Sequence, residues 1–86
     1  FHSTAMGPAA RGLADWMALH PARHLQRRVV STVTAGTLYP GHDLRCHLME
    51  HMTSPVRFIE AMDHVATVAD VCVEVGAGRQ LRCFTR

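Results

Sequence analysis

The sequence predicts an α/β fold in which helices cover short parallel strands. Residues 29–33 and 71–75 are rich in valine, whose branched Cβ suits a strand, and in the second segment the valines alternate with other residues. Three other segments repeat apolar residues at steps of three and four, as amphipathic helices do. Strands separated by helices indicate parallel pairing. Because two strands alone cannot form a sheet covered on both faces, we expect the sheet to be incomplete in this chain.

Size and charge limit the possible functions. The chain has 86 residues, enough for one domain, and its 48% hydrophobic content is that of a globular protein. All nine basic residues are arginines, and the net charge of +2 is too small to indicate nucleic-acid binding. No apolar run is long enough to span a membrane, and no signal peptide is visible. The three cysteines lack C-x-x-C spacing. We therefore expect a cytoplasmic protein that binds neither nucleic acid nor membrane.

The first helix is expected to begin near Ser3 or Thr4, which can cap it, and to end before Pro21. Its apolar stripe consists of Met6, Ala9, Ala10, Leu13, Trp16 and Met17. This stripe indicates core packing. The first strand, residues 29–33, follows a basic connector and is closed by Ala35 and Gly36.

Two further helices are expected in the middle of the chain. Asp43 can cap the first of them, whose apolar face comprises Leu44, Leu48 and Met52. Ser54 and Pro55 are typical of an N-cap followed by the first helical position, which predicts that the next helix begins there. Its apolar stripe consists of Val56, Ile59, Met62 and Ala66.

The second strand, residues 71–75, is followed by Gly76 and Gly78. Two glycines permit a positive φ or a close backbone approach at a tight turn. A helix could begin at Arg79. A strand, a glycine turn and a helix start can place backbone N–H groups beside a site, although most such turns are only turns.

His47, Glu50 and His51 match the H-x-x-E-H pattern of inverted zinc peptidases. Two histidines four residues apart lie on one helix face and could share a zinc ion, with the glutamate as a base. No third ligand with suitable spacing follows, and the apolar stripe competes for the buried face. We therefore expect an exposed helix face and no metal.

No nucleophile is evident in the chain. Ser3, Ser31 and Ser54 all lack the G-x-S-x-G motif that exposes a serine at a strand–helix turn. Cys72 falls within an expected strand, where a small core residue is a better interpretation than a reactive thiolate. The chain thus contains candidate bases without a partner nucleophile.

Five blocks occur in an order that resembles the C-terminal third of the malonyl-CoA:acyl-carrier-protein acyltransferase family, and especially the acyltransferase domains of modular polyketide synthases. The family shows H-A-F-H-S, M-x-P-A-A, V-V-S-N-V-T-G, T-S-P-V-R-F and E-V-G-P-G. The matching segments here are residues 1–3, 6–10, 29–36, 53–58 and 74–78. The resemblance therefore covers residues 1–86 as one segment of a single acyltransferase domain. Thr32, the additional Ala35 and Ala77 depart from the family pattern.

The resemblance implies transfer of a malonyl group from coenzyme A, through an acyl-serine, to the phosphopantetheine thiol of an acyl carrier protein. This reaction serves polyketide or fatty acid synthesis and needs no bound cofactor or metal. The serine elbow and the ferredoxin-like subdomain precede this segment in the family, so the fragment alone is expected to be inactive and to need the remainder of the synthase.

Three site residues follow from the same resemblance. His2 matches the catalytic histidine, and the backbone carbonyl of His51 matches the group that orients it. Phe1 matches a position that carries Phe in malonyl-selective domains and usually Ser in methylmalonyl-selective ones. A bulky ring there leaves little room for an α-methyl group. The alternatives are a non-catalytic docking module derived from such a domain, and the metal-dependent hydrolase considered above.

Overall fold

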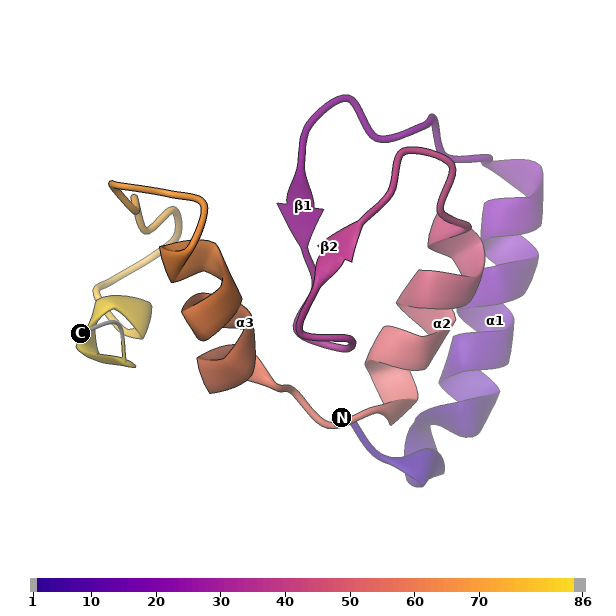
Figure 1. Cartoon of the computed structure of the whole chain (residues 1–86). Coiled ribbons are helices and arrows are strands. Elements are labelled where there is room, and N and C mark those ends of the chain that lie inside the picture. Colours follow the sequence, from indigo (N-terminus) through magenta and orange to yellow (C-terminus); the bar gives the residue numbers. More distant parts are fainter. Residues whose placement is uncertain (1, 85–86) are drawn as a thin grey trace.

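A computed structural model describes residues 2–84, apart from the side chains of residues 83 and 84. It is a small assembly of helices and one two-stranded sheet (Figure 1). In chain order the elements are the 3₁₀ turn η1 (Thr4–Met6), helix α1 (Gly7–Leu19), strands β1 (Val29–Val30) and β2 (Thr37–Leu38), helices α2 (Leu44–Thr53) and α3 (Phe58–Ala66), and the 3₁₀ turn η2 (Leu81–Phe84). This content is compatible with the α/β class.

Helices α1 and α2 pack side by side on one side of the hairpin, and α3 lies on the other (Figure 1). Ala10, Ala14 and Met17 form the buried stripe of α1. Ala10 and Met17 belong to the stripe that the sequence predicts, whereas Ala14 does not. A hydrogen bond links the two helices, because the Nε–H of Arg45 in α2 donates to the Ala14 carbonyl in α1 at 2.9 Å. Ala9 is exposed although it belongs to the expected stripe, and Trp16 is a second exception. Its side chain is 57% exposed and stacks on His20, with ring centroids 4.1 Å apart.

The sheet is an antiparallel hairpin in which Val29 pairs with Leu38. The expected parallel pairing is therefore wrong for the strands that form. The strand predicted over residues 29–33 ends at Val30, because the Ser31 N–H donates to the Gly36 carbonyl at 2.9 Å and closes a turn. Ala35 adopts a φ of 56° in this turn, a left-handed conformation that is rare without glycine.

The strand expected over residues 71–75 does not form. Val71, Val73 and Val75 are 80%, 79% and 92% exposed, and this stretch has no strand partner within residues 2–84. A lone extended segment has no ladder to satisfy its backbone groups, so local alternation alone does not create a strand.

The glycine turn after this segment is present. Gly76 and Gly78 have φ values of 154° and 96°, which is the conformational freedom that the sequence predicted for them. The N–H groups of Gln80 and Leu81 donate to the Glu74 carboxylate at 2.9 and 2.8 Å. These amides are therefore occupied by a side chain of the same loop.

Helix α2 begins as predicted, with Asp43 accepting a hydrogen bond from the Cys46 N–H at 3.2 Å. The face that it buries differs from the prediction, because Leu48 is exposed and His47 is buried. Helix α3 begins at Phe58 and not at Pro55. The Arg57 N–H donates to the Thr32 carbonyl at 2.8 Å, which keeps the segment before α3 extended along the hairpin turn.

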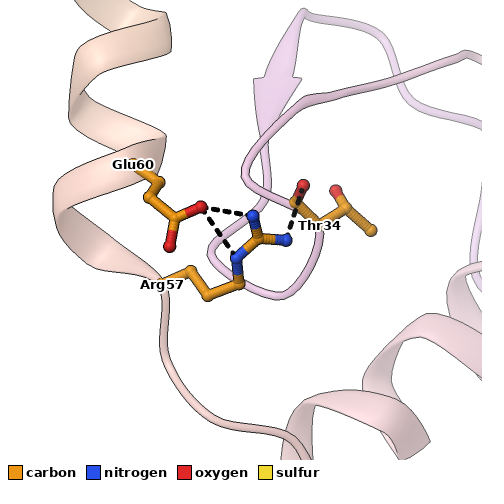
Figure 2. A network of polar contacts seen from close by, with 3 residues as sticks. All are labelled: Thr34, Arg57 and Glu60. Carbon is orange, nitrogen blue, oxygen red and sulfur yellow. Dashed lines mark hydrogen bonds and ion pairs between the residues drawn. The ribbon is translucent and has the colours of Figure 1, made fainter.

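The side chain of Arg57 is also hydrogen-bonded to this turn (Figure 2). Its Nη1 donates to the Thr34 carbonyl at 3.3 Å, and its guanidinium pairs with Glu60 in the first turn of α3. This pairing raises the pKa of Arg57 and lowers the pKa of Glu60, mainly through the shared hydrogen bond. Both side chains are about half exposed, so the ion pair adds little to stability.

The chain leaves an unusual amount of surface open. Its accessible area is 6697 Å² at a mass of 9.5 kDa, whereas a folded monomer of that mass exposes roughly 5,000 Å². Its radius of gyration is 14.3 Å, and about 12 Å is usual for this length. Among the described residues, no helix has the length and apolar character needed to cross a membrane.

Candidate functional site

His2 lies beside the end of helix α2. Its Nδ1 is 2.8 Å from the carbonyl oxygen of His51, and the two imidazole rings meet edge to face with centroids 5.3 Å apart. The structure therefore brings together two of the three residues that the resemblance singles out. His2 has a φ of 58°, in the left-handed region. A non-glycine residue in this region carries backbone strain, and such strained residues cluster at functional sites.

The position of the His51 carbonyl explains why it can accept this hydrogen bond. The Ser54 N–H closes α2 by donating to the Glu50 carbonyl at 2.9 Å. The next residue, Pro55, has no N–H, so it cannot donate to the His51 carbonyl. Every helix leaves its last carbonyls without a helical donor. The His51 carbonyl is one of these, and it accepts a hydrogen bond from the His2 side chain instead.

This contact determines the tautomer of His2. A carbonyl oxygen can only accept, so the proton of a neutral His2 ring lies on Nδ1 and the basic lone pair lies on Nε2. The hydrogen bond to His51 thus fixes which of the two ring nitrogens of a neutral His2 is the acceptor.

A second polar pair lies deeper, where the sequence did not predict one. Ser31 and His47 are 5% and 7% exposed, and the Ser31 Oγ lies 3.0 Å from the His47 Nε2. The Val33 N–H donates to the same Oγ at 3.0 Å. Burial, and then the neighbouring His42, lower the pKa of His47, so its ring is neutral near pH 7.

The Ser31–His47 pair has the distance of a nucleophile and its base. Its burial argues against that role, because a substrate carbonyl could not reach the serine. The His47 Nδ1 is also buried and has no hydrogen-bond partner. The pair therefore links two elements, the turn after β1 and helix α2, and is not a reaction centre.

The H-x-x-E-H residues do not converge. The His47 Nε2 faces Ser31, and the rings of His47 and His51 are 6.5 Å apart and tilted by 43°. Among the described residues, no three His, Cys, Asp or Glu side chains are placed to hold a metal ion. The expectation of an exposed face is wrong for His47, which is buried because it finds a polar partner in the hairpin.

The remaining candidates lie elsewhere. Phe1 is outside the described residues, so its selectivity role stays a prediction. Cys72 is exposed and is not the core residue that the sequence indicated. The glycine turn offers no open amides at Gln80 and Leu81, because Glu74 already accepts from both.

Two curated proteins are similar to the chain, and both are named malonyl CoA-acyl carrier protein transacylase. One, from Bacillus subtilis, is 35% identical over 65 residues, which are 76% of this chain and 16% of the relative. The other, from Bacillus subtilis strain 168, is 32% identical over 82 residues, which are 94% of this chain and 26% of the relative. The chain thus spans about a quarter or less of the length of these relatives.

No protein-family model matches the chain. No solved structure matches it either. The chain is thus similar, over most of its own length, to part of a malonyl CoA-acyl carrier protein transacylase. This similarity agrees with the resemblance in the five sequence blocks.

Proposed function

We propose that the chain is the C-terminal part of an acyltransferase that moves a malonyl group from coenzyme A to an acyl carrier protein. Similarity over 94% of the chain to a protein of that name supports this proposal. The observation that carries it is the hydrogen bond between the His2 Nδ1 and the His51 carbonyl. It leaves the basic lone pair on Nε2, which a general base requires.

In the proposed reaction, His2 serves both halves of a ping-pong transfer. Its Nε2 takes the proton of a serine hydroxyl as the serine oxygen attacks the malonyl thioester carbonyl. The carbon–sulfur bond then breaks, and the proton passes from His2 to the departing coenzyme A sulfur. In the second half, His2 takes the proton of the phosphopantetheine thiol, whose sulfur attacks the acyl-serine, and then returns that proton to the serine oxygen.

The serine in this scheme belongs to an earlier part of the same acyltransferase domain, outside residues 1–86. No step uses a metal or a bound cofactor. The carrier protein is the partner, and the setting is cytoplasmic polyketide or fatty acid synthesis. Phe1 limits the space beside the malonyl α-carbon and so favours malonyl over methylmalonyl groups.

The test uses the longer protein that contains this chain. Transfer of labelled malonyl from coenzyme A to carrier protein is measured for wild type, His2→Ala and His20→Ala. We expect His2→Ala to lose about 10²- to 10⁴-fold in rate, because an unassisted serine is a poor nucleophile. His20→Ala is the matched control, since its exposed ring caps α1 by donating to the Trp16 carbonyl and lies apart from the site.

Two results would contradict the proposal. Full activity of His2→Ala would remove the catalytic assignment. Carrier-protein binding without any malonyl transfer by wild type would favour the non-catalytic docking module, for which the large exposed surface of the chain offers room.

A further inference from the structure

We propose that Ser31 and His47 form a positioning pair that holds helix α2, and with it the His51 carbonyl, in place for His2. This inference rests on the proposed function, because it assigns these residues a role in the orientation of the catalytic base. Neither residue touches the reacting atoms. They act through the backbone of α2.

The geometry connects the pair to the site over one helical turn. His47 and His51 are four residues apart, so they lie on the same side of α2, and their rings are 6.5 Å apart. The His47 Nε2 is hydrogen-bonded to the Ser31 Oγ of the hairpin turn at 3.0 Å. The His51 carbonyl is hydrogen-bonded to the His2 Nδ1 at 2.8 Å. A rotation of α2 that moved this carbonyl would also pull His47 away from Ser31.

The hairpin turn is also attached to the chain just after α2, at Arg57. The Arg57 N–H donates to the Thr32 carbonyl at 2.8 Å. The Arg57 Nη1 donates to the Thr34 carbonyl at 3.3 Å (Figure 2). Residues 47 and 57 are thus both tied to the turn at residues 31–36, and the His51 carbonyl lies between these two attachments. The turn itself is closed by the Ser31 N–H and its Oγ.

The Ser31–His47 pair carries an energetic cost that an apolar side chain at position 47 would avoid. The buried His47 Nδ1 has no hydrogen-bond partner, and an unsatisfied buried polar atom destabilises the folded state. A leucine at this position would fill the space without that cost. What His47 supplies and a leucine cannot is a directed hydrogen bond to the Ser31 Oγ.

Stability and activity should therefore separate in a set of variants of the longer protein. We expect His47→Leu to keep or raise the melting temperature while kcat falls about 10- to 100-fold, the size of effect that small misplacement of a catalytic group produces. The KM for malonyl-CoA should not change. His47→Gln, whose amide can still bond to Ser31, should recover most of kcat. Ser31→Ala should behave like His47→Leu in kcat, and His20→Leu is the control for the same change at an exposed site.

A spectroscopic measurement separates this proposal from the proposed function. In protein labelled with ¹⁵N-histidine, the His2 Nδ1 proton should be protected from solvent exchange in wild type and in His47→Gln. It should exchange faster in His47→Leu. If wild type transfers no malonyl, the function fails but this comparison still tests the positioning pair. Unchanged kcat and unchanged exchange in His47→Leu would overturn the inference, as would an activity loss that His47→Gln does not recover.

Discussion

The Nδ1 of His2 lies 2.8 Å from the backbone oxygen of His51, so the group that orients this histidine is a peptide carbonyl and not a carboxylate. In serine–histidine–aspartate sites an aspartate has this role. Here the last turn of helix α2 supplies both the acceptor and a partial negative charge. The side chain at position 51 is consequently not required for the hydrogen bond.

This arrangement predicts opposite outcomes for two neighbouring histidines. We expect His51→Ala to keep malonyl transfer within a few-fold of wild type, because the carbonyl remains, whereas His2→Ala loses orders of magnitude. Steady-state rates with malonyl-CoA and carrier protein measure both. A loss in His51→Ala as large as that in His2→Ala would mean that the His51 ring itself takes part.

Phe1→Ser in the longer protein should shift selectivity toward methylmalonyl-CoA. Removal of the ring opens space for one methyl group, which is worth about 1–3 kcal/mol in an apolar pocket, or roughly 10- to 200-fold in the ratio of kcat/KM values. Competition between the two acyl-CoA donors measures this ratio. If selectivity is unchanged, Phe1 does not limit the pocket.

His47 should make the stability of the longer protein that contains this chain depend on pH. Burial lowers the pKa of its ring below the value of 6.5 for an unperturbed histidine. Between these two pKa values the unfolded chain binds a proton that the folded chain does not, so the free energy of unfolding falls as the pH is lowered below about 6.5. Urea unfolding at pH 7.5, 6.0 and 5.0 should show this loss, and His47→Gln should show less of it. Equal slopes in both proteins would contradict the assignment to His47.

Ala35→Gly should stabilise the longer protein that contains this chain. Ala35 has a φ of 56°, where an alanine Cβ is strained, and a glycine relieves this strain at some entropic cost in the unfolded state. We expect a net gain of about 0.5–1 kcal/mol in urea unfolding. Ala77→Gly is the matched control, since Ala77 is not among the residues with a positive φ and should gain nothing. A loss of stability in Ala35→Gly would show that the turn is not strained.

The 86-residue chain alone should melt broadly. Its buried apolar residues are few and mostly small, namely Ala10, Ala14, Met17, Leu38 and Ala61 among those that the structure describes. A small core gives weak cooperativity. Calorimetry or circular dichroism against temperature tests this expectation. A sharp, reversible transition above about 60 °C, beyond most mesophilic domains, would argue against the interpretation as part of a larger domain.

Local signals predicted the helices better than the strands. Ala10, Leu13 and Met17 recur at steps of three and four, which predicts α1, and Asp43 predicts the start of α2. Both signals depend on residues within a few positions of each other. The strand at residues 71–75 depends on a partner strand that the described residues do not supply. Alternation of valines therefore could not determine the outcome.

The candidate site shows the same difference between local signals and long-range contacts. The resemblance pointed to the contact between His2 and the His51 carbonyl, and Pro55 is a local sign that this carbonyl lacks a helical donor. The burial of His47 could not be predicted from helix periodicity, which assigned the buried face to Leu44, Leu48 and Met52. It depends on Ser31, 16 residues earlier, and no local pattern marks that partner.

The distance in sequence between His2 and its acceptor has a consequence for the order of folding. The two groups are 49 residues apart, so their contact closes a long loop and its entropic cost must be met by the packing of α2 on α1. A nascent chain that ends before residue 51 contains His2 without its hydrogen-bond acceptor. The tautomer of His2 would therefore become defined only after the second helix docks, late in synthesis of this segment.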